Sequence, residues 1–532
     1  MNYQKNMYRV VTLLVYLVIF FSKNVLTGQV IHEQDFDRFT HYKSEDWITY
    51  APALTITSID ISEDYIFFGT RYGGILRYDL YNRKWRYPFT TSNGLSSNEI
   101  IQIIYNYNDF RWYARTAKGI DVLDPSDNFW KPSYREDLSS IERRKPSEEE
   151  INRFYRNQDS FRFPVFFRPP DSQLPDFFTP NEYLFRKPNE ILDENNRIFR
   201  FTDRIVDQWR NLWLGTDGLG VARANLDNLD LIINPQSLSD IYPKDVEFDA
   251  TSAWIGGTAF GNRRDGILRW EFRNNLWQYF DDRFRFDIYN DQINVIRANQ
   301  EFVFFGTNEG LVKYDKKDRD WHSFTTAHGL ENNLISDLYF EGFTLIIATD
   351  GGVNWSDPPY TQINEPQDNI MDNVSITDIC PYNESVLLAS FRGLYYFSAT
   401  KDSTNFFEVD AAINDIGITA ANMCNDTLWF AGRSGIAYMD RKSGKWTSFT
   451  QIAEQLRSRI HDIKFSGHFV WFATNDGLLR YDKKMDYWYL YTERDGLAHN
   501  RIYNIDVQND ELWLSTRGGV TIFRWQRPNR FE

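Results

Sequence analysis

Cysteine is almost absent from this sequence, which has two, Cys380 and Cys424, in 532 residues. Two cysteines are too few for a four-cysteine zinc site, and these two do not form a CxxC redox motif, so both classes of site are excluded. They are 44 residues apart, and in an oxidising compartment they could form a disulfide. Two separate buried thiols are the alternative.

Basic residues are also in deficit, since 59 Lys and Arg stand against 74 Asp and Glu for a net charge of −15. This balance argues against a nucleic-acid partner, because phosphate binding needs clustered cations. The seven histidines do not cluster in the sequence. His461 next to Asp462 is the pair closest to an acid–base motif, and we expect a structural histidine there.

Long hydrophobic runs are rare, and the longest extends from Val10 to Phe21, after Lys5 and Arg9. A basic start followed by a short apolar run predicts a secretory signal peptide, because a membrane-spanning helix needs about 20 apolar residues. We expect cleavage near Gly28, with a signal peptide at 1–28 and a mature chain at 29–532. An uncleaved membrane anchor is the alternative. The mature protein is expected to be exported without stable membrane insertion, into the periplasm, onto the cell surface or into the medium.

Aromatic residues, in contrast, are abundant at 17%, which favours many short strands over helices. One pattern recurs ten times: an apolar strand ends in a small residue, a turn with glycine follows, and a second strand begins. From Gly306 onwards the small residues are 41 or 42 residues apart. The ten small residues are Gly69, Ala114, Gly215, Gly256, Gly306, Ala348, Ala389, Ala431, Ala473 and Ser515.

Two further spacings keep this register. An Asp six residues before a Trp follows the second strand in five copies, as in Asp79 and Trp85, and the Asp side chain can bond the backbone two residues on. A Gly-Leu pair followed by Asn, as in Gly94 and Asn98, marks the step to the next copy. Four strands in each repeat of about 40–45 residues indicate a β-propeller blade.

These motifs, such as LWLSTRGG near the C-terminus and WYLYTERDGLAHN before it, resemble the two-component-regulator propeller repeat. In that family the repeats usually form the periplasmic sensor of hybrid histidine kinases. The sequence stops at Glu532, directly after the tenth copy, without the immunoglobulin-like domain, membrane helix and kinase of that family. The resemblance therefore implies the fold and a sensing or docking role, not signalling chemistry.

The expected fold is an all-β propeller of about ten four-stranded blades in one ring, with two smaller propellers as the alternative. The tenth copy lacks its outer strand, and an isolated outer strand, Trp47 to Tyr50, precedes the first copy. Pairing of these two segments would close the ring and leave no open sheet edge.

The largest departure from the repeat is an insertion rich in Pro and Phe at 135–195. A second, smaller departure is a long turn at 258–266, and both are expected on one face of the propeller. Long loops on a rigid scaffold commonly carry function. We expect this face to bind a partner through aromatic anchors and arginines, namely Phe166, Phe167, Phe177 and Phe178 with Arg168, Arg263 and Arg264. The alternative is that the insertion only caps the ring and buries its phenylalanines.

Three functions are open from the sequence. The first is an exported, non-enzymatic binding or sensing protein that recognises an envelope protein or glycan. The second is a lyase- or glycosidase-type enzyme with its site at the central channel, which three or more inward carboxylates or histidines from different inner strands would favour. The third is a purely structural envelope component. No catalytic residue, metal or cofactor is assigned.

Overall fold

The computed structural model describes residues 30–31, 42–126, 128–141, 147–149, 166–179, 183–260, 266–280, 292–367, 370–409, 416–449, 452, 456 and 458–526. The expected signal peptide at 1–28 and the predicted site residues Arg263 and Arg264 lie outside these ranges. No helix among the described residues is long and apolar enough to cross a membrane. The chain forms two compact units: unit 1 comprises Met1–Asp37, Phe324–Thr492 and Asn500–Val507, and unit 2 comprises Arg38–Ser323, Glu493–His499 and Gln508–Glu532.

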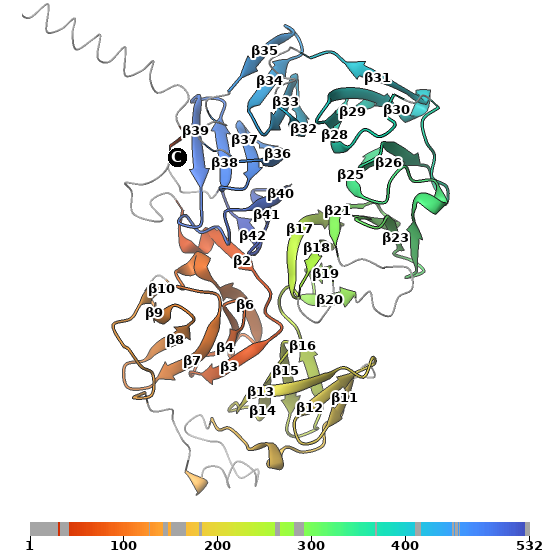
Figure 1. Cartoon of the computed structure of the whole chain (residues 1–532). Coiled ribbons are helices and arrows are strands. Elements are labelled where there is room, and N and C mark those ends of the chain that lie inside the picture. Colours follow the sequence, from red (N-terminus) through yellow and green to blue (C-terminus); the bar gives the residue numbers. More distant parts are fainter. Residues whose placement is uncertain are drawn as a thin grey trace, which may run out of the picture. The chain divides into compact units, whose positions relative to one another are not determined.

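Unit 2 is built of antiparallel sheets whose strands follow one another in chain order (Figure 1). Its first two sheets are β3 (Ile56–Ile61), β4 (Tyr65–Thr70), β5 (Ile75–Asp79) and β6 (Lys84–Phe89), then β7 (Ile100–Asn106), β8 (Arg111–Thr116), β9 (Gly119–Asp124) and β10 (Phe129–Pro132). The third has six strands, β11 (Tyr183–Arg186), β12 (Glu190–Asp193), β13 (Ile198–Val206), β14 (Asn211–Thr216), β15 (Val221–Asn225) and β16 (Leu231–Asn234).

Two more sheets of unit 2 follow the same pattern. They are β17 (Ile241–Phe248), β18 (Ser252–Ala259), β19 (Ile267–Glu271) and β20 (Leu276–Phe280), then β21 (Ile293–Ala298), β22 (Phe302–Thr307), β23 (Leu311–Asp315) and β24 (Trp321–Phe324). The unit also holds β2 (Trp47–Tyr50), β41 (Glu511–Thr516) and β42 (Gly519–Phe523), with short 3-10 turns at η1 (Ser44–Asp46), η2 (Thr91–Asn93) and η3 (Asp171–Gln173).

Unit 1 contains four sheets and β40 (Ile502–Gln508). The sheets are β25 (Ile335–Glu341), β26 (Thr344–Thr349) and β27 (Val353–Ser356); β28 (Ile376–Tyr382), β29 (Ser385–Ser390), β30 (Gly393–Ser398) and β31 (Ser403–Phe407); β32 (Ile418–Cys424), β33 (Thr427–Gly432), β34 (Ile436–Asp440) and β35 (Lys445–Ser448); and β36 (Ile460–Ser466), β37 (Phe469–Thr474), β38 (Leu478–Asp482) and β39 (Tyr487–Tyr491). A short parallel strand, β1 (Val30–Ile31), joins β39, and η5 (Thr326–His328) and η6 (Ala399–Lys401) are 3-10 turns.

The small residue of each repeat lies where the innermost strand of a neighbouring sheet packs against it. A Cβ atom on Gly69 would lie 2.7 Å from Cγ2 of Ile100, and one on Gly256 would lie 2.6 Å from Cγ2 of Ile293. Such distances are too short for a carbon–carbon contact, so glycine is required at these two positions. The hydrophobic cores accordingly lie between adjacent sheets, as with Ile346, Val353, Val386 and Phe397. The chain is therefore all-β, with the packed four-stranded sheets of a β-propeller.

The turn motifs have the expected structures. Asp124, Asp315 and Asp482 each accept a hydrogen bond from the backbone N–H two residues on, at 2.8–3.0 Å. Gly94 ends η2 with φ of 92°, which is why glycine stands there. The Oδ1 atom of Asn98 accepts a bond from the backbone N–H of Thr91 at 2.8 Å, which fixes the step to the next sheet.

The strand before the first repeat completes the last one, as the sequence predicts. β2 pairs antiparallel with β42, with Trp47 opposite Phe523 and Tyr50 opposite Val520. The rings of Trp47 and Phe523 stack with their centroids 3.8 Å apart. This pairing covers the edge of β42, which would otherwise present free backbone groups.

The order of the sheets in unit 2 differs from a single ring built in chain order. Such a ring would place β3 between β7 and the last repeat, but β3 packs between β7 and β13 instead (Figure 1). β17 likewise packs between β21 and β41. Gly215 of β14 leaves room for β3 at this place, because Ile56 of β3 lies directly against it.

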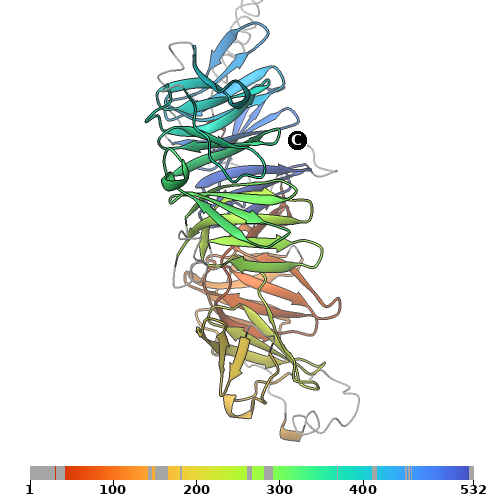
Figure 2. The same cartoon turned by 90° about the vertical axis from the view of Figure 1, so that its right-hand side faces the viewer.

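The insertion adds two strands to the third sheet of unit 2. β11 and β12 form a hairpin on the free edge of β13, where Ile191 pairs with Phe199 (Figures 1 and 2). β13 is long enough to serve both neighbours, because its first half pairs with β12 and its second half, from Phe201 to Val206, pairs with β14. The third sheet thus has six strands rather than four.

Candidate functional site

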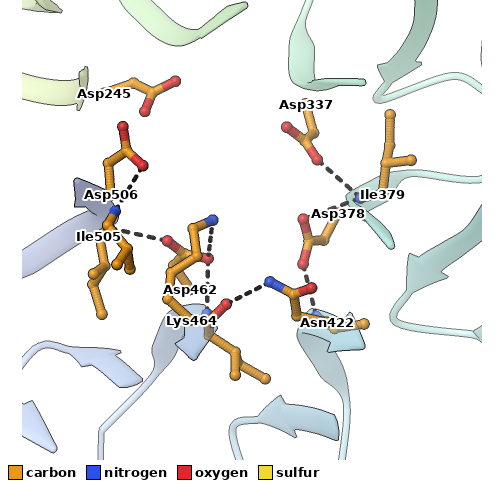
Figure 3. A network of polar contacts seen from close by, with 12 residues as sticks. Asp245, Asp337, Asp378, Ile379, Asn422, Asp462, Lys464, Ile505 and Asp506 are labelled. Carbon is orange, nitrogen blue, oxygen red and sulfur yellow. Dashed lines mark hydrogen bonds and ion pairs between the residues drawn. The ribbon is translucent and has the colours of Figure 1, made fainter. Parts of the chain in front are cut away.

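An aspartate recurs at a bulge of the innermost strand in five sheets and joins that strand to a neighbouring one. Figure 3 shows this for Asp337 with Ile379 and for Asp462 with Ile505. One carboxylate oxygen accepts the N–H of the following residue, as Asp378 does from Ile379 at 3.0 Å. The other oxygen accepts an N–H of the neighbouring innermost strand. These aspartate bridges run from Asp203 to Ile59, Asp245 to Ile296, Asp337 to Ile379, Asp378 to Ala421 and Asp462 to Ile505, at 2.7–2.9 Å.

The aspartate bridges bear directly on the enzyme interpretation. Three different inner strands of unit 1 carry a carboxylate, namely Asp337, Asp378 and Asp462. Three is the smallest number that would favour an enzyme site at the channel. Each of these carboxylates nevertheless accepts a hydrogen bond from a backbone N–H of a neighbouring strand. This role in joining strands explains why an aspartate stands at these positions. Burial, followed by the nearby charges of Asp337 and Asp462, raises the pKa of Asp378 well above its ordinary range.

His461 lies on β36, as expected, and its Nε2 is 2.9 Å from Oδ1 of Asn475. Asp462 beside it is held by its own bridge and by Nζ of Lys464 at 3.1 Å. Among the described residues, no group of three or more His, Cys, Asp and Glu could hold a metal ion. The contacts of this pair are those of structural residues.

The structure corrects the prediction that four phenylalanines of the insertion form exposed anchors. Phe166, Phe167 and Phe177 are buried, with 3%, 7% and 8% of their surface exposed, and only Phe178 of the four is exposed, at 69%. Phe166 packs into the core between the first and third sheets of unit 2, and Phe167 and Phe177 pack into the third. Three of the four predicted anchors are therefore part of the folded core.

Arg168 is likewise engaged inside the molecule rather than free for a partner. Its Nη1 lies 2.9 Å from Oδ1 of Asp203 on β13, and its Nη2 lies 3.0 Å from Oδ1 of Asp60 on β3. The same two nitrogens donate to the carbonyl oxygens of Arg204 and Ile59, at 2.8 and 2.7 Å. Arg168 thus ties the first sheet to the third.

The two cysteines are not bonded to each other. Cys380 pairs with Leu387 on β29, and the equivalent position of the next sheet, paired with Trp429, is Asn422 rather than Cys424. The extra two residues shift Cys424 along its strand by about 6.6 Å at about 3.3 Å per residue. This shift follows from a spacing of 44 where the local repeat is 42.

A cleft of about 940 Å³ lies in unit 2. Its walls come from β2, from β6 and from the turn between β19 and β20. Aromatic side chains line much of it, among them Tyr65, Trp85, Tyr87, Trp270 and Phe272. The volume is within the usual range of small-molecule sites, roughly 300–1,000 Å³.

The centre of the cleft is shaped by a proline. Pro88 interrupts β6, where the pairing register with β5 shifts between Ile75 and Arg77, because proline has no N–H to donate to the ladder. The carbonyl oxygen of Tyr87 instead accepts a hydrogen bond from Nε of Arg77 at 2.7 Å. The Arg77 guanidinium also lies over the ring of Phe89, 3.7 Å from its centroid. Two contacts therefore fix its orientation.

The charges around the cleft are unbalanced. The lining residues include five cations, Arg77, Arg83, Lys84, Arg86 and Arg524, but one acid, Glu45. Asp79 pairs with Arg86 at 2.7 Å, and Glu511 pairs with Arg524 at 2.7 Å. Arg77 has no carboxylate partner among the described residues, and burial lowers its pKa to about 10, so it stays protonated at neutral pH.

The same repeat position carries a cation in other sheets, and these show what a purely structural role looks like. Arg269 of β19 lies 5.4 Å from the ring centroid of Trp254 and pairs with Glu271 at 3.1 Å. Arg480 of β38 is 4% exposed and is surrounded by aromatic rings. Arg77 has the same kind of aromatic contact, but it lines the cleft and makes no ion pair with a carboxylate among the described residues.

Sequence reasoning missed both the aspartate bridges and the cleft. The bridging aspartate precedes the small residue by 11 positions in four of its five sheets, as in Asp337 and Ala348, so a closer reading of the repeat would have found it. The cleft has a weaker signal, the proline inside the outer strand KWRYPF. Its other walls come from distant parts of the chain, which no local pattern brings together.

No family model matches this chain, and no curated protein matches its sequence. The chain is similar to the solved extracellular domain of BT4673 from B. thetaiotaomicron, described as a hybrid two-component system, with a TM-score of 0.45 and 15% identity over 89% of this chain and 70% of that one. The corresponding domain of BT3049 from the same organism gives 0.44 and 15%, over 88% and 68%. Virginiamycin B lyase from Staphylococcus aureus gives 0.43 and 12%, over 53% and 94%. The first two are of the class that the repeat motifs resemble.

Proposed function

We propose that this chain is an exported, non-enzymatic binding protein of the sensing type, and that its ligand binds in the cleft of unit 2. The observation that carries the proposal is Arg77, a fixed cation without a carboxylate partner among the described residues, inside a cleft lined by aromatic rings. A concave, largely preformed site with a few oriented polar groups is the usual form of a small-molecule site. The inner-strand carboxylates support a binding role over catalysis, since each one joins strands.

A macromolecular partner, an envelope protein or glycan, remains part of this proposal. The insertion would meet it with the side chains that stay exposed, Phe178 at 69% and Leu184 at 62%. The periplasm, the cell surface and the medium are the places where such a partner would be met. A Phe178→Ser, Leu184→Ser double variant should lose an envelope partner that the wild type captures, without a change in the unfolding midpoint.

The proposed ligand site is tested with a variant in which a large side chain fills the cleft. Asn274 is exposed and lines the cleft, whereas its neighbour Arg273 is exposed and does not line it. The unfolding midpoint is measured for wild type, Asn274→Trp and Arg273→Trp with a panel of acidic, neutral and basic ring compounds and with the small molecules of an envelope extract. A ligand that binds the native state raises the midpoint.

We expect at least one of these samples to stabilise wild type and Arg273→Trp but not Asn274→Trp. Equal stabilisation of all three proteins would place the ligand elsewhere and contradict the proposal. The absence of any stabilisation would also contradict it.

A further inference from the structure

We infer that the ligand of the cleft carries a carboxylate on a ring, and that the two Nη atoms of Arg77 bind the carboxylate. This inference rests on the proposed function and names the chemical class of the ligand. The cations at the same position in two other sheets are engaged differently, since Arg269 pairs with Glu271 and Arg480 donates to the hydroxyl of Tyr487 among aromatic rings.

The first argument is the orientation of Arg77. Its Nε is taken by the Tyr87 carbonyl oxygen and its face by Phe89. The Nη atoms have no hydrogen-bond partner among the described residues, and they carry four N–H donors in one plane. Such a planar fork matches the two oxygens of a carboxylate, and holding it fixed in advance reduces the entropy lost on binding.

The second argument is charge. Arg86 stands directly opposite Arg77 in the pairing of β5 and β6, and like charges in that position destabilise a sheet. Asp79 neutralises Arg86, so the positive charge of Arg77 is left over. Arg83 and Lys84 at the rim add charge of the same sign. An anion in the cleft would offset a partly buried charge that the fold leaves unpaired.

The third argument is the size and lining of the cleft. A carboxylate fills only a small part of about 940 Å³. The remaining walls combine aromatic rings, such as Tyr87 and Phe272, with the amides of Asn274 and Gln236. Aromatic walls favour flat or ring-shaped ligands, and amides bind hydroxyl groups. A sugar acid and an aromatic acid share this chemistry. A phosphate, which commonly recruits several converging donors, fits a single fork less well.

The experiment measures binding to the full chain by isothermal titration calorimetry. The probes are glucuronate and benzoate, their neutral counterparts glucose and benzyl alcohol, and glucose 6-phosphate. The proteins are wild type, Arg77→Met and Arg77→Lys. Met keeps an apolar stem over Phe89 but has no charge, and Lys keeps the charge without the planar fork. The unfolding midpoint of each variant confirms that it is folded.

We expect glucuronate, benzoate or both to bind at least about tenfold more tightly than the neutral counterpart, a factor in keeping with a charge-assisted pair. Arg77→Met should weaken that binding about tenfold or more. The affinity of Arg77→Lys should lie between those of wild type and Arg77→Met. Binding of glucuronate alone identifies a sugar acid, and binding of benzoate alone identifies an aromatic acid.

Three results would overturn the inference. They are equal binding of acidic and neutral probes, tighter binding of glucose 6-phosphate than of both acids, and unchanged acid binding by Arg77→Met. Binding of none of the probes would also overturn it. None of these results decides the proposed function, because the Asn274→Trp comparison tests that function with ligands of every charge.

Discussion

At the scale of single residues, the aspartate bridges show why a charged side chain recurs on the innermost strands. A bulge leaves an N–H without a ladder partner, and a carboxylate has enough acceptor sites to bond it and an N–H of the next strand at once. Asp245 and Asp462 do this in units 2 and 1 with nearly the same distances. A serine, Ser58, takes the place in the first sheet and accepts from Ile103 at 3.2 Å.

Asp378 makes stability depend on pH in a defined direction. Its pKa is raised in the folded protein by burial and by two neighbouring carboxylates. Between the unfolded value of about 3.9 and the raised folded value, the folded state binds more protons, so stability falls as pH rises through this interval. Asp378→Asn should remove this contribution, which is at most about 1.4 kcal/mol per pH unit for one proton. Urea unfolding of wild type and variant across this interval measures it.

Asp245→Asn is the matched control, because this aspartate has the same kind of bridge, lies 3.2 Å from Arg297 and is not among the charges that raise the pKa of Asp378. We expect the slope attributed to Asp378 to persist in that variant. If Asp378→Asn keeps the pH slope of wild type, the account of its pKa is wrong.

The two thiols should differ in reactivity. Burial and the nearby Asp378 raise the pKa of Cys380, which is fully buried, whereas Cys424 is partly exposed. The thiolate is the reactive form, so a thiol reagent should label Cys424 in the native protein and Cys380 only after unfolding. Peptide mass spectrometry identifies the labelled site. A Cys380–Cys424 disulfide peptide in the native protein would contradict the structure.

At the scale of elements, the insertion acts as a connector. The described segment that begins at Phe166 contributes this residue to the core between the first and third sheets, and it contributes Arg168 to the carboxylates of β3 and β13. Asp60 is only 8% exposed in this pair. Removal of the cation would take away the opposite charge that Arg168 supplies to two carboxylates with reduced solvation.

Arg168→Met should therefore lower the free energy of unfolding by roughly 1–3 kcal/mol, discounted for the 27% exposure of the arginine. Arg186→Met is the matched control within the same insertion, since Arg186 is 50% exposed and pairs with Glu190. Its effect should stay within about 0.5 kcal/mol. Urea unfolding measures both, and equal losses would show that Arg168 has no special role.

The repeats were predictable from the sequence because their signals are local. The strands and the Asp turns follow from spacing within about 40 residues, and the closing strand Trp47–Tyr50 follows from the outer strand that the tenth copy lacks. The neighbour of β3 was not predictable, since β13 and Arg168 lie more than 100 residues away. The burial of Phe166 has the same cause, because an aromatic residue in a Pro-rich insertion gives no indication of which side faces the core.

At the scale of the whole molecule, a chain with a net charge of −15 has a cleft in unit 2 where cations predominate. Such a contrast steers anions to one place and keeps them from the rest of the surface. Binding to the cleft should accordingly weaken as salt increases, because the rim cations Arg83 and Lys84 are exposed and screened. The cleft thus gives an acidic protein a local preference for anions.

The most direct test of the central claim is a crystal structure of the protein grown with whichever ring carboxylate binds in the calorimeter. We predict electron density for the ligand in the cleft of unit 2, with its carboxylate oxygens within hydrogen-bonding distance, about 2.7–2.9 Å, of the Nη atoms of Arg77. Density for the ligand at another surface, with the cleft holding only water, would contradict the account.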